Sequence, residues 1–160
     1  MKLPANLNKE SITAIIDTRE QWVLDLPGLK TERATLTTGD YSLKGFERHV
    51  AIERKSLDDL VACCGRERER FDREVQRLLA YSVRALVVEA TWQDIESGQW
   101  RSQLTPKQIA SSLISWQVQG LPVITAENHK RAGQIVAAML RRVAIHRWRE
   151  LRSLAQHFTV

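Results

Sequence analysis

Cysteine is scarce in this sequence of 160 residues: the two present are Cys63 and Cys64, which are adjacent. Neighbouring cysteines rarely close an unstrained disulfide, so a disulfide-stapled secreted fold is excluded. The four histidines show no zinc-ligand spacing with them. We therefore interpret both thiols as core or half-buried groups in a reducing compartment.

Long apolar runs are also missing. No run approaches the roughly 20 apolar residues that cross a bilayer, and the first ten residues are polar, without the apolar core of a signal peptide. Internal repeats, low-complexity segments and linkers are lacking too. These absences argue against membrane-spanning, secreted and repeat classes and predict one globular domain.

Charge of both signs is abundant by contrast. Lys and Arg number 24 against 19 Asp and Glu, which gives a net charge of +5, and hydrophobic residues make up 43%. The apolar fraction is ordinary for a soluble domain with a packed core. The basic balance permits nucleic-acid binding, but a basic protein without such a partner fits the composition equally well.

The hydrophobic pattern predicts alternating strands and helices. Three β-rich runs come first, and strand-helix units follow, so we expect an α/β fold with a mixed central sheet flanked by helices. The expected strands are residues 12–16, 33–43, 50–55, 84–90 and 121–126. The expected helices begin at Ser56, Thr105 and Asn128, with another over residues 66–79 and a short turn or helix at 91–98.

The run over residues 50–55 starts as a buried strand and ends in Glu53, Arg54 and Lys55. Because strand side chains alternate, Glu53 and Lys55 share one face and Arg54 takes the other. A carboxylate can hold a hard cation, and a nearby ammonium can orient water or neutralise a phosphate, which suits metal-assisted phosphodiester cleavage. The triplet alone is a weak signal, since solvated strands often carry such pairs.

A second carboxylate is needed for this chemistry, and Asp40 is the candidate. It follows Gly39 within the expected strand over residues 33–43. A turn through Gly45 would join this strand to residues 50–55 as a hairpin and bring Asp40 beside Glu53.

Together these residues resemble a known family. Gly39-Asp40, Glu53-Arg54-Lys55 and Asp59 read as G-D-x(n)-E-R-K-x-x-x-D, which is similar to the signature of XPF-type structure-specific nucleases, a branch of the restriction-endonuclease-like superfamily. Residues 15–20, Ile-Ile-Asp-Thr-Arg-Glu, resemble that family's first strand. The resemblance covers residues 11–143, between a lead-in at 1–10 and a basic helical tail at 144–160. It implies a restriction-endonuclease-like core and a Mg²⁺- or Mn²⁺-dependent endonuclease acting on branched or flap DNA.

The resemblance also implies roles for individual residues. Asp40 and Glu53 are expected to bind the metal, with Asp17 assisting, and Lys55 to position the attacking water. Arg54 is expected to anchor the motif or meet a phosphate. Supporting roles fall to Arg19, Glu20 and Asp59.

Each supporting residue has a structural alternative. Asp17 can be a cap or turn residue, and Arg19 and Glu20 can form a surface salt bridge. Asp59 fits a capping box that begins at Ser56, and we consider this the larger part of its role.

Three arginines, Arg66, Arg68 and Arg70, follow the charged strand closely and are candidates for DNA-backbone contacts. Because they alternate with acidic residues, a self-paired solvated face is an equal alternative. Trp92 and Trp100 can stack on bases, but packing against the sheet is the stronger expectation.

The resemblance further implies dimerisation, homomeric or heteromeric, through the C-terminal helices. Family members usually carry a helix-hairpin-helix module, but this chain has no Gly-x-Gly and no Walker loop. The chain is therefore expected to dimerise, to recruit a partner that binds DNA or to bind DNA through its own arginines, and it suits a cytoplasmic, nucleoid-associated protein of a bacterium or phage. The alternative is a non-catalytic DNA-binding or scaffolding subunit, although such subunits lose the acidic and lysine positions that are present here.

Overall fold

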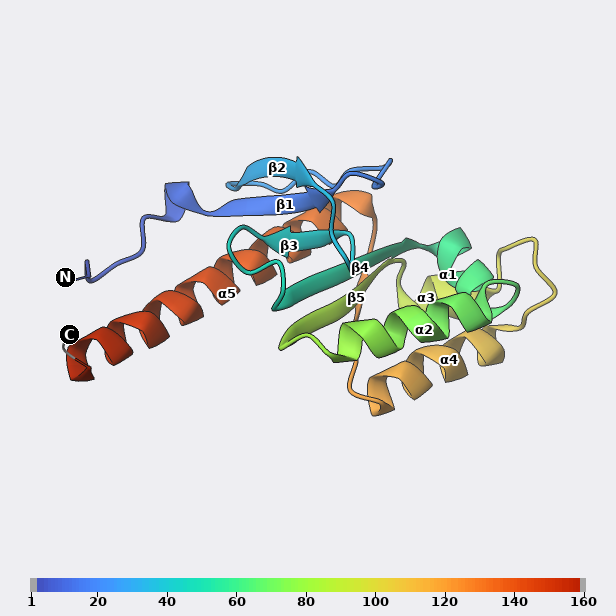
Figure 1. Ribbon diagram of the computed structural model, residues 1–160. Coiled ribbons are helices and arrows are strands. Elements are labelled where there is room, and N and C mark those ends of the chain that lie inside the picture. Colours follow the sequence, from blue (N-terminus) through green and yellow to red (C-terminus); the bar gives the residue numbers. More distant parts are fainter. Residues whose placement is uncertain (1–2, 159–160) are drawn as a thin grey trace.

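A computed structural model describes residues 3–158. Within them the chain forms one six-stranded mixed sheet in the order β2-β1-β3-β4-β5-β6, flanked by helices (Figure 1). The strands are β1 (Thr13–Asp17), β2 (Lys30–Ala34), β3 (Tyr41–Leu43), β4 (Val50–Ser56), β5 (Val83–Glu89) and β6 (Val123–Ala126). The helices are the short η1 (Lys9–Ser11), α1 (Leu57–Cys64), α2 (Arg68–Leu79), α3 (Trp92–Ser97), α4 (Pro106–Val118) and α5 (His129–His157). The predicted α/β class is confirmed.

The strand directions gather several strand ends at one edge of the sheet. β1, β4, β5 and β6 run in the same direction, and β3 lies antiparallel between β1 and β4. The carboxyl ends of those four strands therefore lie at the same edge as the start of β3. We call this the carboxyl edge; at it lie Asp17, Asp40, Ser56, Glu89 and Ala126.

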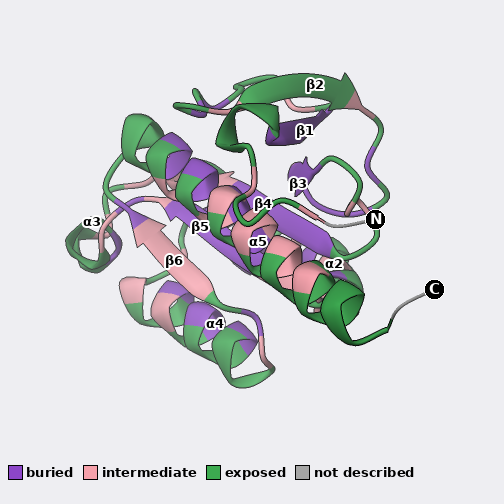
Figure 2. Cartoon of the chain, turned by 90° about the vertical axis from the view of Figure 1, so that its left-hand side faces the viewer, coloured by how far each residue is buried: buried purple, intermediate pink, exposed green. Residues whose placement is uncertain are grey.

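Helices cover both faces of the sheet and bury two apolar clusters. α5 packs on one face over Val50 and Ile52 of β4, whereas α1, α2 and α4 pack on the other over Ala51. Figure 2 shows the helices α4 and α5 buried toward the sheet and exposed away from it. This alternation along β4 continues into its charged end, so Glu53 and Lys55 face α1 and α2 while Arg54 faces the α5 side.

The predicted single strand over residues 33–43 is wrong. Its first part belongs to β2, which pairs with β1 at the outer edge of the sheet, and its last part is β3 on the other side of β1. Residues 35–40 cross between them at the carboxyl edge. Gly39 lies in this crossing with a φ of 79°, and a Cβ there would come within 3.2 Å of the Ile52 backbone. The β-rich composition of residues 33–43 therefore gave no sign of the chain reversal at Gly39, whose backbone conformation requires glycine.

The other predicted elements agree with the structure within a few residues. The hairpin through Gly45 is confirmed, since β3 pairs antiparallel with β4 and Tyr41 lies opposite Ile52. Both cysteines are buried. α5 runs unbroken for 29 residues, so the domain boundary proposed at residues 143/144 falls inside it. Among the described residues, no helix has the length and apolar character needed to cross a membrane.

Candidate active site

Asp40 is fixed at the carboxyl edge by backbone hydrogen bonds on both sides. Its N–H donates to the Ile52 carbonyl (2.9 Å), and its carbonyl accepts from the Asp17 N–H (2.8 Å). The Arg54 backbone N–H donates to Asp40 Oδ2 at 2.8 Å. The crossing segment thus ties Asp40 to the charged end of β4, as the two sequence motifs predicted.

Glu53 and Lys55 lie on the same face of β4 and form an ion pair. Lys55 Nζ lies 2.7 Å from Glu53 Oε1, and both side chains are largely buried, with 17% and 8% of their surface exposed. The ammonium also stands 5.2 Å from the centroid of the Phe71 ring on α2, a cation-π contact. α2 therefore forms the wall that holds Lys55 against Glu53.

The two carboxylates on this face, Asp40 and Glu53, both have raised pKa values. Burial, together with the charge of Glu53, raises the pKa of Asp40 to about 8. Burial also raises the pKa of Glu53, with Lys55 opposing the shift. Burial disfavours the charged form of Lys55, but the charges of Glu53, Cys63 and Asp40 keep its pKa above the ordinary value. One ammonium therefore does not balance two buried carboxylates.

This donor set fits a hard divalent cation. Mg²⁺ and Mn²⁺ prefer carboxylate oxygens, and Mg²⁺ typically takes one or two from the protein and completes its shell with water and phosphate. Within residues 3–158, no group of three or more His, Cys, Asp or Glu side chains is close enough to hold a metal. The fit accordingly rests on Asp40 and Glu53, whose raised pKa values a bound cation would reverse.

Arg54 lies on the opposite face of β4 in a separate polar network. Its Nε donates to Glu89 Oε1 at 2.7 Å, and its Nη1 lies 3.8 Å from Glu20 Oε1. Its guanidinium is only 7% exposed. These partners occupy Arg54 within the fold, so the geometry favours the predicted anchoring role over a phosphate contact.

His129 and Glu89 complete this network, and sequence reasoning missed both. His129 Nδ1 lies 2.7 Å from Glu89 Oε1 and its Nε2 lies 3.3 Å from the Val23 carbonyl oxygen. Glu89 ends β5, and His129 begins α5 three residues after the end of the parallel strand β6. This placement was the available signal, but using it required the correct strand order.

Asp17 is almost fully buried and organises the crossing segment. Oδ1 accepts from the Arg19 N–H and Nε, both at 2.8 Å, and Oδ2 accepts from Arg19 Nη2 and the Leu36 N–H. The hydrogen bond from Arg19 lowers the pKa of Asp17 to about 2. Both oxygens are thus engaged, and this geometry does not support the predicted part of Asp17 in metal binding.

The other supporting residues divide between the two sides of the site. Arg19 holds Asp17 and leaves 70% of its side chain exposed. Glu20 is 8% exposed and lies 3.8 Å from Arg54 Nη1, so its ion pair is buried and differs from the simple salt bridge between surface groups that was the alternative. The Ser56 hydroxyl accepts from the Asp59 N–H and donates to its carboxylate, which confirms the capping interpretation.

Three predicted DNA-binding arginines lie at or near the start of α2. Arg68 is committed to the fold: it bonds Asp72 and Ser112 and lies over the Trp116 ring. Arg70 is 71% exposed and pairs with Glu67 at 2.7 Å, and Arg66 is exposed.

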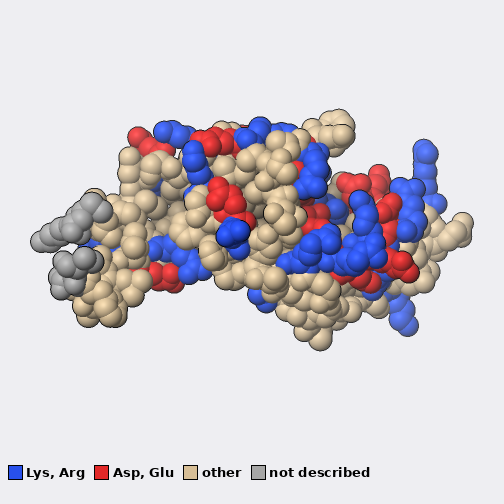
Figure 3. Space-filling view, viewed as in Figure 1, with Lys and Arg blue, Asp and Glu red and all other residues tan. Residues whose placement is uncertain are grey.

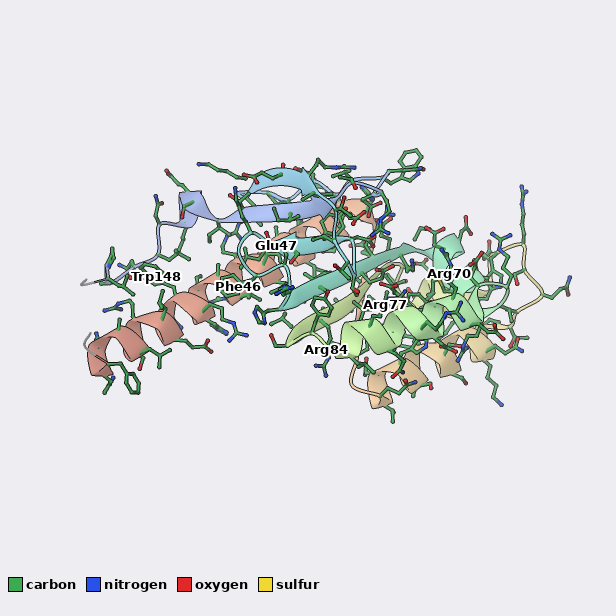
Figure 4. All side chains as sticks on the ribbon, in the orientation of Figure 1. Phe46, Glu47, Arg70, Arg77, Arg84 and Trp148 are labelled. Carbon is green, nitrogen blue, oxygen red and sulfur yellow. The ribbon has the colours of Figure 1, made fainter. Side chains whose placement is uncertain are left out.

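Figure 3 shows Lys and Arg side chains gathered over α2 with acidic groups beside them, and Figure 4 shows Arg70 and Arg77 projecting from that helix. Arg77 pairs with Glu74 on the same helix. The basic surface is therefore partly self-paired, as the alternating charges predicted.

The two predicted tryptophans differ in exposure. Trp100 is half-buried against the α1, α2 and α4 cluster and donates its indole N–H to the Leu104 carbonyl. Trp92 begins α3 at the carboxyl edge and remains 42% exposed. The packing expectation is met by Trp100 only.

Comparison with known proteins agrees with this fold. Two solved structures of XPF from Aeropyrum pernix are similar: one gives a TM-score of 0.65 at 18% identity over 82% of this chain. The other, in complex with DNA, gives 0.64 at 18% identity over 84%. The chain spans 61% and 66% of the length of those two chains.

No curated protein matches the sequence. The family comparison does: the ERCC4 domain matches residues 16–139, a span that includes every predicted site residue. The predicted resemblance is therefore confirmed, and the chain belongs to the ERCC4 domain family, with the fold of an XPF nuclease domain.

Proposed function

We propose that this protein is a divalent-metal-dependent DNA endonuclease that hydrolyses phosphodiester bonds near branches or flaps. The observation that carries the proposal is the set of Asp40, Glu53 and Lys55, held together on one face of β4 at the carboxyl edge. Membership of the ERCC4 domain family and likeness to an XPF structure solved with DNA support it.

The site residues have distinct parts in this reaction. Asp40 and Glu53 would hold Mg²⁺ or Mn²⁺, and the ion would supply Lewis-acid stabilisation of charge on the scissile phosphate and on the attacking water. Lys55 keeps its proton because its pKa is raised. It therefore acts as a fixed cation that orients the water or balances phosphate charge, and it does not serve as the base.

Arg54 acts on this site through its backbone and its anchoring. Its N–H fixes Asp40 Oδ2 while its guanidinium is tied to Glu89 on the other face. This two-sided attachment prevents β4 from rotating its charged end, so Asp40 and Glu53 keep their spacing when the ion leaves. Preorganisation of this kind is what charge stabilisation at a transition state requires.

The DNA path and the partner are also part of the proposal. Exposed Arg66 and Arg70 lie beside α1 on the catalytic face and offer phosphate contacts. The C-terminal half of α5 extends beyond the sheet (Figure 1) and exposes Leu151, Leu154 and Phe158. These apolar side chains support dimerisation, with a second copy or a related subunit, through this helix.

Cleavage of end-labelled DNA tests the proposal. Flap, splayed-arm, four-way-junction and plain duplex substrates are incubated with Mg²⁺ or Mn²⁺ and with wild type, Asp40→Asn or Lys55→Ala. We expect metal-dependent nicking near the branch by wild type and loss to background in both variants. Arg48→Ala, at an exposed position in the turn between β3 and β4, is the control and should cut normally. DNA binding without cleavage at any metal concentration would contradict the proposal and indicate a non-catalytic scaffolding subunit.

A further inference from the structure

A tryptophan stands exposed beside the proposed active site. Trp22 has 74% of its surface accessible, more than any other tryptophan of the chain. It lies five residues after Asp17 in the loop that leaves the carboxyl edge. An indole that is 74% exposed buries little apolar surface within the fold and leaves most of its ring free to contact a partner.

The loop around Trp22 is held in place on several sides. Arg33 Nη2 donates to the carbonyl of Glu20 at 2.8 Å, and the Leu24 N–H donates to the Tyr41 hydroxyl at 2.9 Å. His129 Nε2 lies 3.3 Å from the Val23 carbonyl oxygen. These contacts flank Trp22 directly, before and after it in the chain.

Apolar packing fixes the same loop. Leu24 and Leu26 are 2% and 4% exposed and belong to the cluster beneath α5. The segment therefore has its anchors on the inner side and presents Trp22 on the outer side. A flexible loop would leave an indole free to turn inward, but this backbone keeps it turned toward solvent.

The same loop adjoins the catalytic groups. Glu20, two residues before Trp22, lies 3.8 Å from the Arg54 guanidinium, and its charge contributes to the raised pKa values of Asp40 and Glu53. Arg19, three residues before, exposes 70% of its side chain. An exposed cation and an exposed indole thus belong to the same loop, and the charge of Asp40 acts on that cation.

We propose that Trp22 stacks on an unpaired DNA base at the branch and so gives the site its preference for branched over continuous duplex DNA. An aromatic ring stacks on any base but only where that base is not already stacked between two neighbours. The adjoining Arg19 matches the charge of the phosphate that accompanies such a base. This inference rests on the proposed function, because the unpaired base belongs to the branched DNA that the proposed endonuclease would cut.

The test measures binding without cleavage, in the Asp40→Asn chain with Mg²⁺. The DNAs are a splayed-arm duplex with 2-aminopurine as the first unpaired base and a fully paired duplex of equal length. Anisotropy reports affinity, and 2-aminopurine quenching reports stacking. Trp22→Ala is compared with Trp22→Phe, which retains a stacking ring, and with Val118→Ala, which trims an 83% exposed apolar side chain at the end of α4.

We expect Trp22→Ala to lose about five-fold or more in affinity for the splayed arm, with no change for duplex and with the quenching abolished. Trp22→Phe should restore most of both signals, and Val118→Ala should match its parent. Equal affinity losses on both DNAs, or unchanged quenching in Trp22→Ala, would overturn the inference. A changed molecular mass in sedimentation with unchanged DNA preference would do so too, because the indole would then contact protein.

Cleavage by the wild-type chain on the same DNAs separates the two proposals. Quenching that depends on Trp22 without any cleavage would contradict the endonuclease and support base stacking. Cleavage that is equally branch-selective in wild type and in Trp22→Ala would support the endonuclease and overturn base stacking.

Discussion

Each face of β4 brings one cationic side chain together with two carboxylates, but the pairing between cation and carboxylates differs between the two faces. On the α5 side, the Arg54 guanidinium reaches Glu89 and Glu20, and His129 adds a further contact to Glu89. On the other side, the Lys55 ammonium pairs with Glu53, and Asp40 receives a backbone N–H.

Raised pKa values mark the face with Asp40 and Glu53 as the one that calls for a ligand. The pKa of Asp40 rises to about 8 and that of Glu53 also rises, since burial acts on both and the charge of Glu53 acts on Asp40. A planar guanidinium can serve two carboxylates at once, whereas an ammonium is a point charge. Counting the charges on each face does not identify the site. What identifies it is whether the cation on that face can contact both carboxylates.

The largest expected effect on stability comes from disrupting the ion pairs on the α5 face of β4. Replacing Arg54 with Met removes the cation from two buried carboxylates, and we expect the free energy of unfolding to fall by about 3–5 kcal/mol. Urea titration followed by tryptophan fluorescence measures it. Added Mg²⁺ should not restore the lost stability, because the carboxylates left without a cation, Glu20 and Glu89, lie on the face without the proposed metal ligands. Full restoration by Mg²⁺ would show that the two faces are not independent.

The same substitution on the catalytic face has a different signature. Lys55→Met leaves Asp40 and Glu53 without their cation, so the unfolding free energy of the metal-free protein should fall by about 3 kcal/mol. Here Mg²⁺ is expected to recover stability while cleavage stays absent. Urea titrations with EDTA and with Mg²⁺ check this, and a loss indifferent to Mg²⁺ would argue against a cation at this pair.

Asp17 sharpens the comparison through pH. Its pKa is about 2 in the folded chain against an ordinary value of 3.8, so the folded state favours the charged form. The stability it contributes, about 2 kcal/mol, is present above about pH 4 and is lost as the pH falls toward 2. Wild type should therefore exceed Asp17→Asn in melting temperature at pH 6, and the gap should narrow at pH 2.5. A constant gap across this range would show that the ionised carboxylate is not what stabilises the crossing.

The smallest effects separate two arginines on α2. Arg68→Ala removes contacts to Ser112 and Trp116 and should lower the unfolding free energy by about 1 kcal/mol. Arg70→Ala should leave stability nearly unchanged, because exposed ion pairs contribute little. It should instead lower the slope of log affinity for DNA against log salt by about 1. Anisotropy titrations at several salt concentrations measure that slope, and an unchanged slope would remove Arg70 from the DNA path.

Local sequence was sufficient for the catalytic face and insufficient for the other. The period of two in β4 separated Glu53 and Lys55 from Arg54, and Ser56 correctly began the next helix. The partners of Arg54 lie 35 residues away in Glu89 and 75 away in His129. Such pairings depend on strand order, which the pattern of residues does not specify.

The prediction of one strand across the β2–β3 crossing was wrong for a related reason. Threonines give residues 33–43 a strand-like composition, and only Gly39 signals the reversal. The reversal is stabilised from outside, by Asp17 holding the Leu36 N–H. The sequence motif therefore predicted Asp40 beside the charged end of β4, where its carboxylate accepts from the Arg54 N–H, while misplacing the backbone that brings it there.

Binding of Mn²⁺, followed by electron paramagnetic resonance, tests the central claim most directly. Wild type, Asp40→Asn and Glu89→Gln are titrated with Mn²⁺ in the absence of DNA. The two variants each neutralise one carboxylate, on opposite faces of β4. We predict that Asp40→Asn loses the bound-Mn²⁺ signal and that Glu89→Gln binds like wild type. Equal binding by wild type and Asp40→Asn, or loss only in Glu89→Gln, would contradict the assignment of the metal to the Asp40 and Glu53 face.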